Sequence, residues 1–342
     1  MQAFEITRIL ILATVGFCVA MAFTPLLSHF LYKYNLGKQI RSNKPIFHSF
    51  HLKKEGTPTM GGILIWGTVL FLAFIFWLFS MFNITVFKDL NFLNRGETFL
   101  PIGIMIFAAF VGLGDDLLGI FKKGPNGGGM GVIRKLILYV VIAAVGSWWF
   151  YFKLDWDLIS VPFLGSFNIG LWYIPAFIFI IVATAFSANE TDGLDGLLGG
   201  VSLAAFLSLG VIAFSQGRYD LAAFCGIVIG ATLAFLWFNI YPARFFMGDT
   251  GSMSLGVTLG VIAMLTNTAL LLPFIASVLF IETLSVIIQF FYKKIRGRKL
   301  FYSTPLHHHF EAMGWPETKI TMRFWIIAGV MAFIGVVIGL LG

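Results

Sequence analysis

Long apolar segments alternate with short polar ones along the whole 342-residue chain. A helix of about 20 apolar residues can cross the roughly 30 Å hydrocarbon core of a bilayer, and segments of that length recur about ten times. We therefore predict an all-α integral membrane protein with about ten transmembrane helices. The expected spans are 9–32, 60–82, 99–121, 133–152, 171–188, 197–214, 220–239, 252–268, 270–292 and 322–341.

The segment between the fourth and fifth expected spans has a different pattern. Residues 154–170 alternate apolar and polar positions, and Pro162, Gly165 and Asn168 are typical turn residues. We expect a short β-hairpin outside the membrane here. Because no separate soluble segment and no long repeat is visible, residues 1–342 are interpreted as one transmembrane domain. The first span lacks a small-residue cleavage pattern, so we expect a retained helix.

Composition supports a membrane location and excludes several function classes. Hydrophobic residues make up 58% of the chain and charged residues only 11%, whereas about a quarter of a soluble domain is charged. The net charge of +7 lies beside apolar spans, which indicates membrane orientation rather than nucleic-acid binding. Cys18 and Cys225 lie in separate apolar spans, so neither a disulfide framework nor a CxxC site is expected.

The distribution of basic residues predicts the orientation. Eighteen of the 23 Lys and Arg residues lie on or beside the loops that follow odd-numbered spans. Cytoplasmic loops hold the excess of positive charge, so these loops are expected in the cytoplasm and both termini outside it. The unusual polar motifs fall on the same loops, and we therefore expect one active-site cleft at the cytoplasmic face.

Acidic residues are concentrated where the expected spans end. Asp115 and Asp116 follow an apolar run in GLGDDLLG, Asp192 and Asp195 lie in NETDGLDG, and Asp249 lies in FFMGDTGS. Carboxylates at a membrane edge are costly and tend to be functional, and paired ones bind divalent cations or shift a pKa. The alternatives are solvated interfacial acids for the pair, helix capping for NETDGLDG and a simple turn around Asp249.

Basic and aromatic residues complete a set suited to a nucleotide. Phe246 could stack on a base beside Asp249, and Lys54 could meet phosphate while Thr59 offers a hydroxyl. Lys122 and Lys135 flank a glycine-rich loop that lacks the ending of a phosphate-binding loop, so they are only candidate phosphate partners. For the lysines, the alternative is the ordinary excess of positive charge in cytoplasmic loops.

Three adjacent histidines lie in the last cytoplasmic loop, and two polar residues lie in the span before it. The histidines are internal, so they are no purification tag, and adjacent histidines are unlike the spaced ligands of zinc sites. We expect phosphate or sugar contact from His307, His308 and His309, with a lid helix as the alternative. Glu282 and Gln289 lie two turns apart on one face, where an interhelical polar contact is as plausible as a substrate contact.

This inventory points to metal-assisted phosphoryl transfer with a lipid partner. The chain also resembles the phospho-N-acetylmuramoyl-pentapeptide transferases (the MraY family) over nearly its whole length, on the segments GTPTMGG, GDDLLG, NETDGLDG, FFMGDTGS and PLHHHFEAMGWPE. The DD, NxTDGxDG and MGD elements are shared across the superfamily of polyprenyl-phosphate hexosamine-1-phosphate transferases, whereas PLHHHFE with GTPTMGG is specific to this family. Glu190 departs from the family pattern, which usually has an apolar residue there.

The resemblance implies Mg²⁺-dependent transfer of phospho-MurNAc-pentapeptide from UDP-MurNAc-pentapeptide to undecaprenyl phosphate, which gives lipid I and UMP in peptidoglycan synthesis. It also implies a homodimer in the bacterial cytoplasmic membrane. Asp249 is the expected Mg²⁺ ligand. The expected catalytic residues are Asp115, Asp116, Asp249, His308 and His309. The expected substrate-binding residues are Lys54, Thr59, Lys122, Lys135, Asn189, Asp192, Gly193, Asp195, Asn239, Phe246, Gln289 and His307.

Two other functions are weighed against this one. A sister transferase acting on UDP-N-acetylglucosamine would share the acids but should lack the histidine segment. A transporter would place its ionisable residues near the middle of the membrane, in broken helices, whereas most of them here lie at the cytoplasmic edge.

Overall fold

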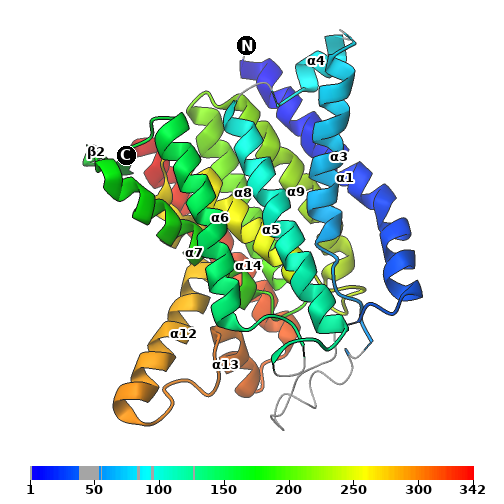
Figure 1. Cartoon of the computed structure of the whole chain (residues 1–342), viewed down its shortest axis with the longest axis vertical. Coiled ribbons are helices and arrows are strands. Elements are labelled where there is room, and N and C mark those ends of the chain that lie inside the picture. Colours follow the sequence, from blue (N-terminus) through cyan, green and yellow to red (C-terminus); the bar gives the residue numbers. More distant parts are fainter. Residues whose placement is uncertain (1, 38–53, 55, 83–84, 94–95, 126–127) are drawn as a thin grey trace.

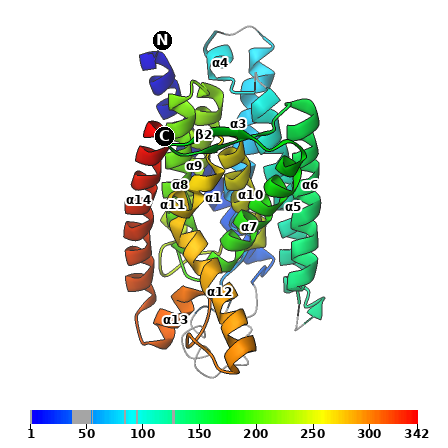
Figure 2. The same cartoon turned by 90° about the vertical axis from the view of Figure 1, so that its left-hand side faces the viewer.

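A computed structural model of the protein describes residues 2–37, 54, 56–82, 85–93, 96–125 and 128–342. It is a bundle of helices, shown in two views in Figures 1 and 2. Its α-helices are α1 Gln2–Lys33, α3 Ile63–Ser80, α4 Thr85–Leu90, α5 Gly96–Ile120, α6 Val132–Lys153, α7 Tyr173–Thr191, α8 Leu197–Ser215, α9 Tyr219–Asn239, α10 Gly248–Leu265, α11 Leu272–Ile275, α12 Ser277–Arg296, α13 Leu306–Ala312 and α14 Glu317–Leu341.

The number of membrane-crossing helices agrees with the sequence pattern. Among the described residues, nine helices are long and apolar enough to cross a membrane, and the bent pair Ala269–Ile275 and Ser277–Arg296 makes ten if it is counted as one span. The predicted all-α membrane architecture with about ten spans is therefore confirmed. Both termini lie toward one end of the bundle, and α13 lies at the other (Figure 1). We call the α13 end the site end below.

The ninth span is bent rather than straight, which the continuous apolar run 270–292 does not indicate. The chain turns by 92° between the two helices, because Ala276 leaves helical geometry with φ −119° and ψ 41°. Beyond the bend α12 leans away from the other helices (Figure 1). Its buried residues end at Ser285, so its second half extends past the bundle.

Helix α10 is the centre of the bundle, packed mainly between α5 and α7. All 18 of its residues are buried. Glycines allow this packing, because a Cβ at Gly256 would lie 2.7 Å from both Ala188 Cβ and Thr184 O on α7. On α5, a Cβ at Gly112 would lie 2.3 Å from the carbonyl oxygen of Asp249. Small residues let membrane helices approach closely, and here they bring the acid-bearing ends of α5, α7 and α10 together.

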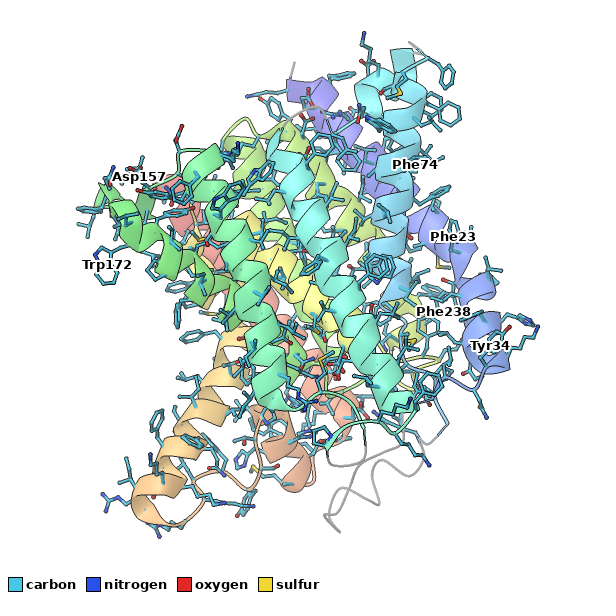
Figure 3. All side chains as sticks on the ribbon, viewed as in Figure 1. Phe23, Tyr34, Phe74, Asp157, Trp172 and Phe238 are labelled. Carbon is cyan, nitrogen blue, oxygen red and sulfur yellow. The ribbon has the colours of Figure 1, made fainter. Side chains whose placement is uncertain are left out.

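The outer surface is apolar, as expected for a bundle in lipid. Phe23 on α1 and Phe74 on α3 project outward (Figure 3) and are 39% and 52% exposed. The predicted hairpin is present as strands β1 Leu158–Val161 and β2 Gly165–Asn168, which pair antiparallel with Leu158 opposite Asn168. It lies near the C-terminus, away from the site end (Figure 2).

Candidate active site

Two acids and an asparagine from three helices meet around one lysine at the site end. The ammonium group of Lys135, from the first turn of α6, lies 2.8 Å from Asp115 Oδ2 on α5 and 2.8 Å from Asp249 Oδ1 on α10. Asn189, at the end of α7, donates its side-chain amide to Asp249 and to Ser252 Oγ. We call Asp115, Lys135, Asn189 and Asp249 the acid–lysine centre. These residues, predicted separately from four segments, form one cluster.

Asp116 lies beside this centre with its side chain directed elsewhere. It is 0% exposed, and its two carboxylate oxygens accept the backbone N–H groups of Asp249 (3.1 Å) and Thr250 (3.0 Å). The first N–H groups of a helix have no partner within the helix, so Asp116 caps α10 from outside. Gly248 is required here, since its φ is +75° and a Cβ would lie 2.5 Å from Asp116 Oδ2. The predicted catalytic pair thus divides into Asp115 at the centre and Asp116 as a support for Asp249.

A second polar cluster lies around Lys54. Its ammonium group lies 2.6 Å from Asp195 Oδ1 and 2.6 Å from Glu317 Oε1, and 5.8 Å from the centre of the Phe246 ring. Burial alone would lower the pKa of Lys54, but the charges of Glu317 and Asp195 outweigh it and raise the pKa above its ordinary value. The face of an aromatic ring such as Phe246 can stack on a planar base. We call Lys54, Asp195, Phe246 and Glu317 the Lys54 pocket.

Glu317 was not among the residues predicted from the sequence. It is the first residue of α14 and the last residue of the segment PLHHHFEAMGWPE, so its place in that motif was the signal that could have found it. Its carboxylate also accepts the backbone N–H of Asp195 at 2.6 Å. Glu317 therefore ties the loop that follows α7 to the last helix, and it holds Lys54 in place.

Two segments distant in the sequence run side by side to form this pocket. Phe246 donates its N–H to Pro58 O and accepts the Gly61 N–H, both at 2.8 Å. This pairing brings the predicted residue Phe246 next to the segment that follows Lys54. Thr59 in the same segment is 1% exposed. Asn239 is also buried, with its side chain bonded to Gly196 N and Phe245 O, both at 2.9 Å, so it crosslinks two loops.

The three histidines occupy three different environments on α13. His307 is 0% exposed and lies against Glu282 of α12. His308 is partly exposed, with Nδ1 2.6 Å from Glu311 Oε2, and burial lowers its pKa despite that carboxylate. His309 stacks on Tyr302 with ring centroids 5.4 Å apart. Direct substrate contact was predicted for all three, but His307 is closed off from any substrate in this structure.

Three further residues predicted from the sequence, Gln289, Lys122 and Asp192, belong to neither the acid–lysine centre nor the Lys54 pocket. Gln289 binds the loop after α12, accepting the N–H groups of Leu300 and Phe301 at 2.9 and 3.0 Å. It is thus placed as a loop support rather than in the Lys54 pocket. Lys122 is exposed just past the end of α5. Asp192 is the C-cap residue that directly follows α7 and precedes Gly193.

The acid–lysine centre offers a limited set of metal donors. Within the described part of the chain, no three His, Cys, Asp or Glu side chains are grouped closely enough to enclose a metal ion. Two carboxylates, Asp115 and Asp249, nevertheless face one ammonium group at 2.8 Å each, which is a position that a divalent cation could share. Mg²⁺ usually uses one or two carboxylates and completes its shell with water and substrate phosphate. The residues present therefore fit Mg²⁺ brought together with a diphosphate.

Comparison with known proteins gives one consistent result. Residues 98–267 match the family profile of glycosyl transferase family 4, and residues 54–65 match signature 1 of phospho-N-acetylmuramoyl-pentapeptide-transferase. A protein of that name from Chloroflexus aggregans is 39% identical over 98% of this chain and 91% of its own length. Proteins with the same name from Clostridium perfringens strain 13 (39%) and Anoxybacillus flavithermus (37%) each match over 96% of this chain and 97% of their own.

Proposed function

Because the chain belongs to the phospho-N-acetylmuramoyl-pentapeptide-transferase family, we propose that it transfers phospho-MurNAc-pentapeptide from UDP-MurNAc-pentapeptide to undecaprenyl phosphate. The products are lipid I and UMP. One observation carries the proposal beyond the family name: an acid–lysine centre and a Lys54 pocket lie at the same end of a membrane bundle. The first suits a diphosphate and the second a uracil base.

The donor can be placed by its chemistry. Uracil would stack on Phe246 and form hydrogen bonds in the Lys54 pocket, and the diphosphate would extend toward Lys135.

In the reaction the bond between the bridging diphosphate oxygen and the sugar-side phosphorus breaks, and UMP keeps that oxygen. A new P–O bond forms from the lipid phosphate. Negative charge grows on the leaving oxygen, and the partly buried ammonium group of Lys135 would stabilise such charge.

The side chains of the centre have distinct tasks in this scheme. Asp115 and Asp249 hold the Lys135 ammonium between them, and Asp116 fixes the first turn of α10 so that Asp249 points at the centre. We propose that the activity depends on Mg²⁺, held by Asp249 with Asp115. The ion, when bound, would supply positive charge for the diphosphate.

An apolar groove provides a place for the polyprenyl chain. It lies between α7 and the α11–α12 bend, with a volume of about 240 Å³. Phe179, Pro273, Leu279 and Phe280 are among its lining residues, and so is Ser187, two residues before Asn189 on α7. A chain in this groove would bring its phosphate toward the acid–lysine centre from the lipid.

We also propose the membrane arrangement that the resemblance implies. The site end would face the bacterial cytoplasm, because α5 and α12 end there in basic segments that include Lys122, Lys123, Lys293 and Lys294, and both termini would lie outside. The working form would be a homodimer. Crosslinking of the purified protein in lipid, read as a band of twice the monomer mass, tests the last statement.

The decisive experiment compares donors. Purified protein with Mg²⁺ and undecaprenyl phosphate should release UMP from UDP-MurNAc-pentapeptide far faster than from UDP-N-acetylglucosamine. Substituting His308 and His309 together with alanine should lower transfer while sparing uridine binding, since the Lys54 pocket lies on other elements. Preference for UDP-N-acetylglucosamine would instead assign the chain to the sister activity. Uptake of the donor into vesicles without UMP release would indicate a transporter.

A further inference from the structure

Glu282 is a buried carboxylate with no part in the chemistry described above. It is 0% exposed and is the only acid in the sequence of α12. An ionisable side chain in a membrane helix is costly and usually serves a function. Both carboxylate oxygens of Glu282 accept the backbone N–H of His307, at 3.2 and 3.3 Å, and Oε2 lies 3.2 Å from His307 Nδ1. Glu282 therefore fastens the first turn of α13 to α12.

The His307 ring fits against Gly193 of the NETDGLDG loop. A Cβ built at Gly193 would lie 2.2 Å from His307 Nε2 and 2.9 Å from Cε1. The backbone of Gly193 is not in the left-handed region, so the close approach of the ring is what requires glycine. Neither ring nitrogen has a well-directed hydrogen bond among the described residues, which is costly for buried polar atoms. Steric packing against Gly193, rather than hydrogen bonding, therefore fixes the position of the His307 ring.

We propose that Glu282 and His307 are positioning residues that fix α13, and with it His308, relative to the acid–lysine centre. Glu282 holds the helix from one side, and the His307 ring fills the space over Gly193 from the other. The rings of His307 and His308 have centroids 4.2 Å apart, so a displacement of the first moves the second. This inference rests on the proposed function.

The contact between Glu282 and His307 would also connect the binding sites of the two substrates. Leu279 and Phe280 of α12 line the apolar groove, and Glu282 follows them within one turn. The helix that would hold the polyprenyl chain is therefore fastened to the helix that bears His308. Neither Glu282 nor His307 reaches a substrate itself, because both side chains are fully buried.

The steric part is tested by a double-mutant cycle. Gly193→Ala should lower kcat about 10- to 100-fold, as expected when reacting groups are displaced by about 1 Å, and His307→Ala should do the same. The double variant should be no worse than His307→Ala alone, since the added methyl then meets no ring. Gly329→Ala is the matched control, because a Cβ there meets nothing within 4 Å. Losses that multiply would overturn the proposal.

The carboxylate part is tested with Glu282→Gln and Glu282→Ala. The glutamine keeps an acceptor for the His307 N–H, so it should retain more activity than the alanine variant. In Glu282→Ala, kcat should fall by about 10-fold or more. In both variants, UMP affinity should stay within about threefold, because the Lys54 pocket is intact. An equal fall in kcat and UMP affinity would indicate general loss of structure and overturn the positioning role. His29→Gln, on the exposed face of α1, is the control for histidine replacement.

Folding and function are separated by two further comparisons. Thermal melting in detergent identifies any variant that fails to fold, and His307→Asn, which also removes the atom nearest Gly193, then replaces His307→Ala in the cycle. If the wild-type protein releases no UMP from UDP-MurNAc-pentapeptide, the proposed function fails. If the wild-type protein is active and the Glu282 and His307 variants equal it, the positioning role fails while the function stands.

Discussion

Replacing Asp116 with asparagine should weaken both the fold and the reaction. The two oxygens of Asp116 accept the N–H groups of Asp249 and Thr250 at 3.1 and 3.0 Å, and an asparagine offers one oxygen and an NH₂ group that faces an N–H. Hydrogen bonds to a charged group contribute about 1.5–3 kcal/mol. Loss of one should therefore reduce stability by about that amount. It should also release Asp249 from its orientation, at a cost of about 100-fold in turnover.

The assay for Asp116→Asn measures melting and turnover on the same preparation. At about 2 °C per kcal/mol, the melting midpoint should fall by roughly 3 to 6 °C. Turnover is followed as UMP release at saturating donor. Asp89→Asn is the control, because Asp89 lies exposed on α4 and should change neither quantity. An unchanged midpoint together with lost turnover would refute the capping argument and place Asp116 in the chemistry itself.

Three further variants test the two clusters. Asp249→Asn should abolish Mg²⁺-dependent UMP release and leave the protein folded, because an amide lacks the charge that Mg²⁺ requires; near-normal turnover at ordinary Mg²⁺ concentration would contradict this. Phe246→Ala should weaken uridine-nucleotide binding by about 1–3 kcal/mol in calorimetry, and an unchanged affinity would remove Phe246 from the pocket. The raised pKa of Lys54 means that its ion pairs are fully formed below the ordinary lysine pKa and are lost as pH rises through the higher value. Glu317→Gln should lower that pKa, so uridine affinity should decline at a lower pH than in the wild type, and identical pH profiles would count against Glu317.

Much of the fold could be predicted because membrane insertion leaves a simple pattern. Each span must satisfy its own backbone hydrogen bonds inside the hydrocarbon core and must be apolar over about 20 residues to cross it, so the length of apolar runs indicates the number of helices. The bend at Ala276 could not be predicted in this way, since the apolar run continues through it. Pro273 lies shortly before the break, in the first turn of α11, where proline is common, so it does not by itself mark a bend.

The site could be predicted as a set of segments but not as a set of roles, and helix geometry explains why. Successive residues of an α-helix point about 100° apart, so neighbours in one motif reach different surroundings. Asp115 faces Lys135, while Asp116 caps α10.

The histidines of α13 show the same division over three residues. His307 is closed in against α12, His308 bonds to Glu311, and His309 stacks on Tyr302. A motif of adjacent identical residues therefore need not be a site in which every member contacts substrate. In each motif one fully buried member has a supporting position: Asp116 caps α10 beside Asp249, and His307 packs next to His308. Its substitution should act through geometry rather than through the loss of a reacting group.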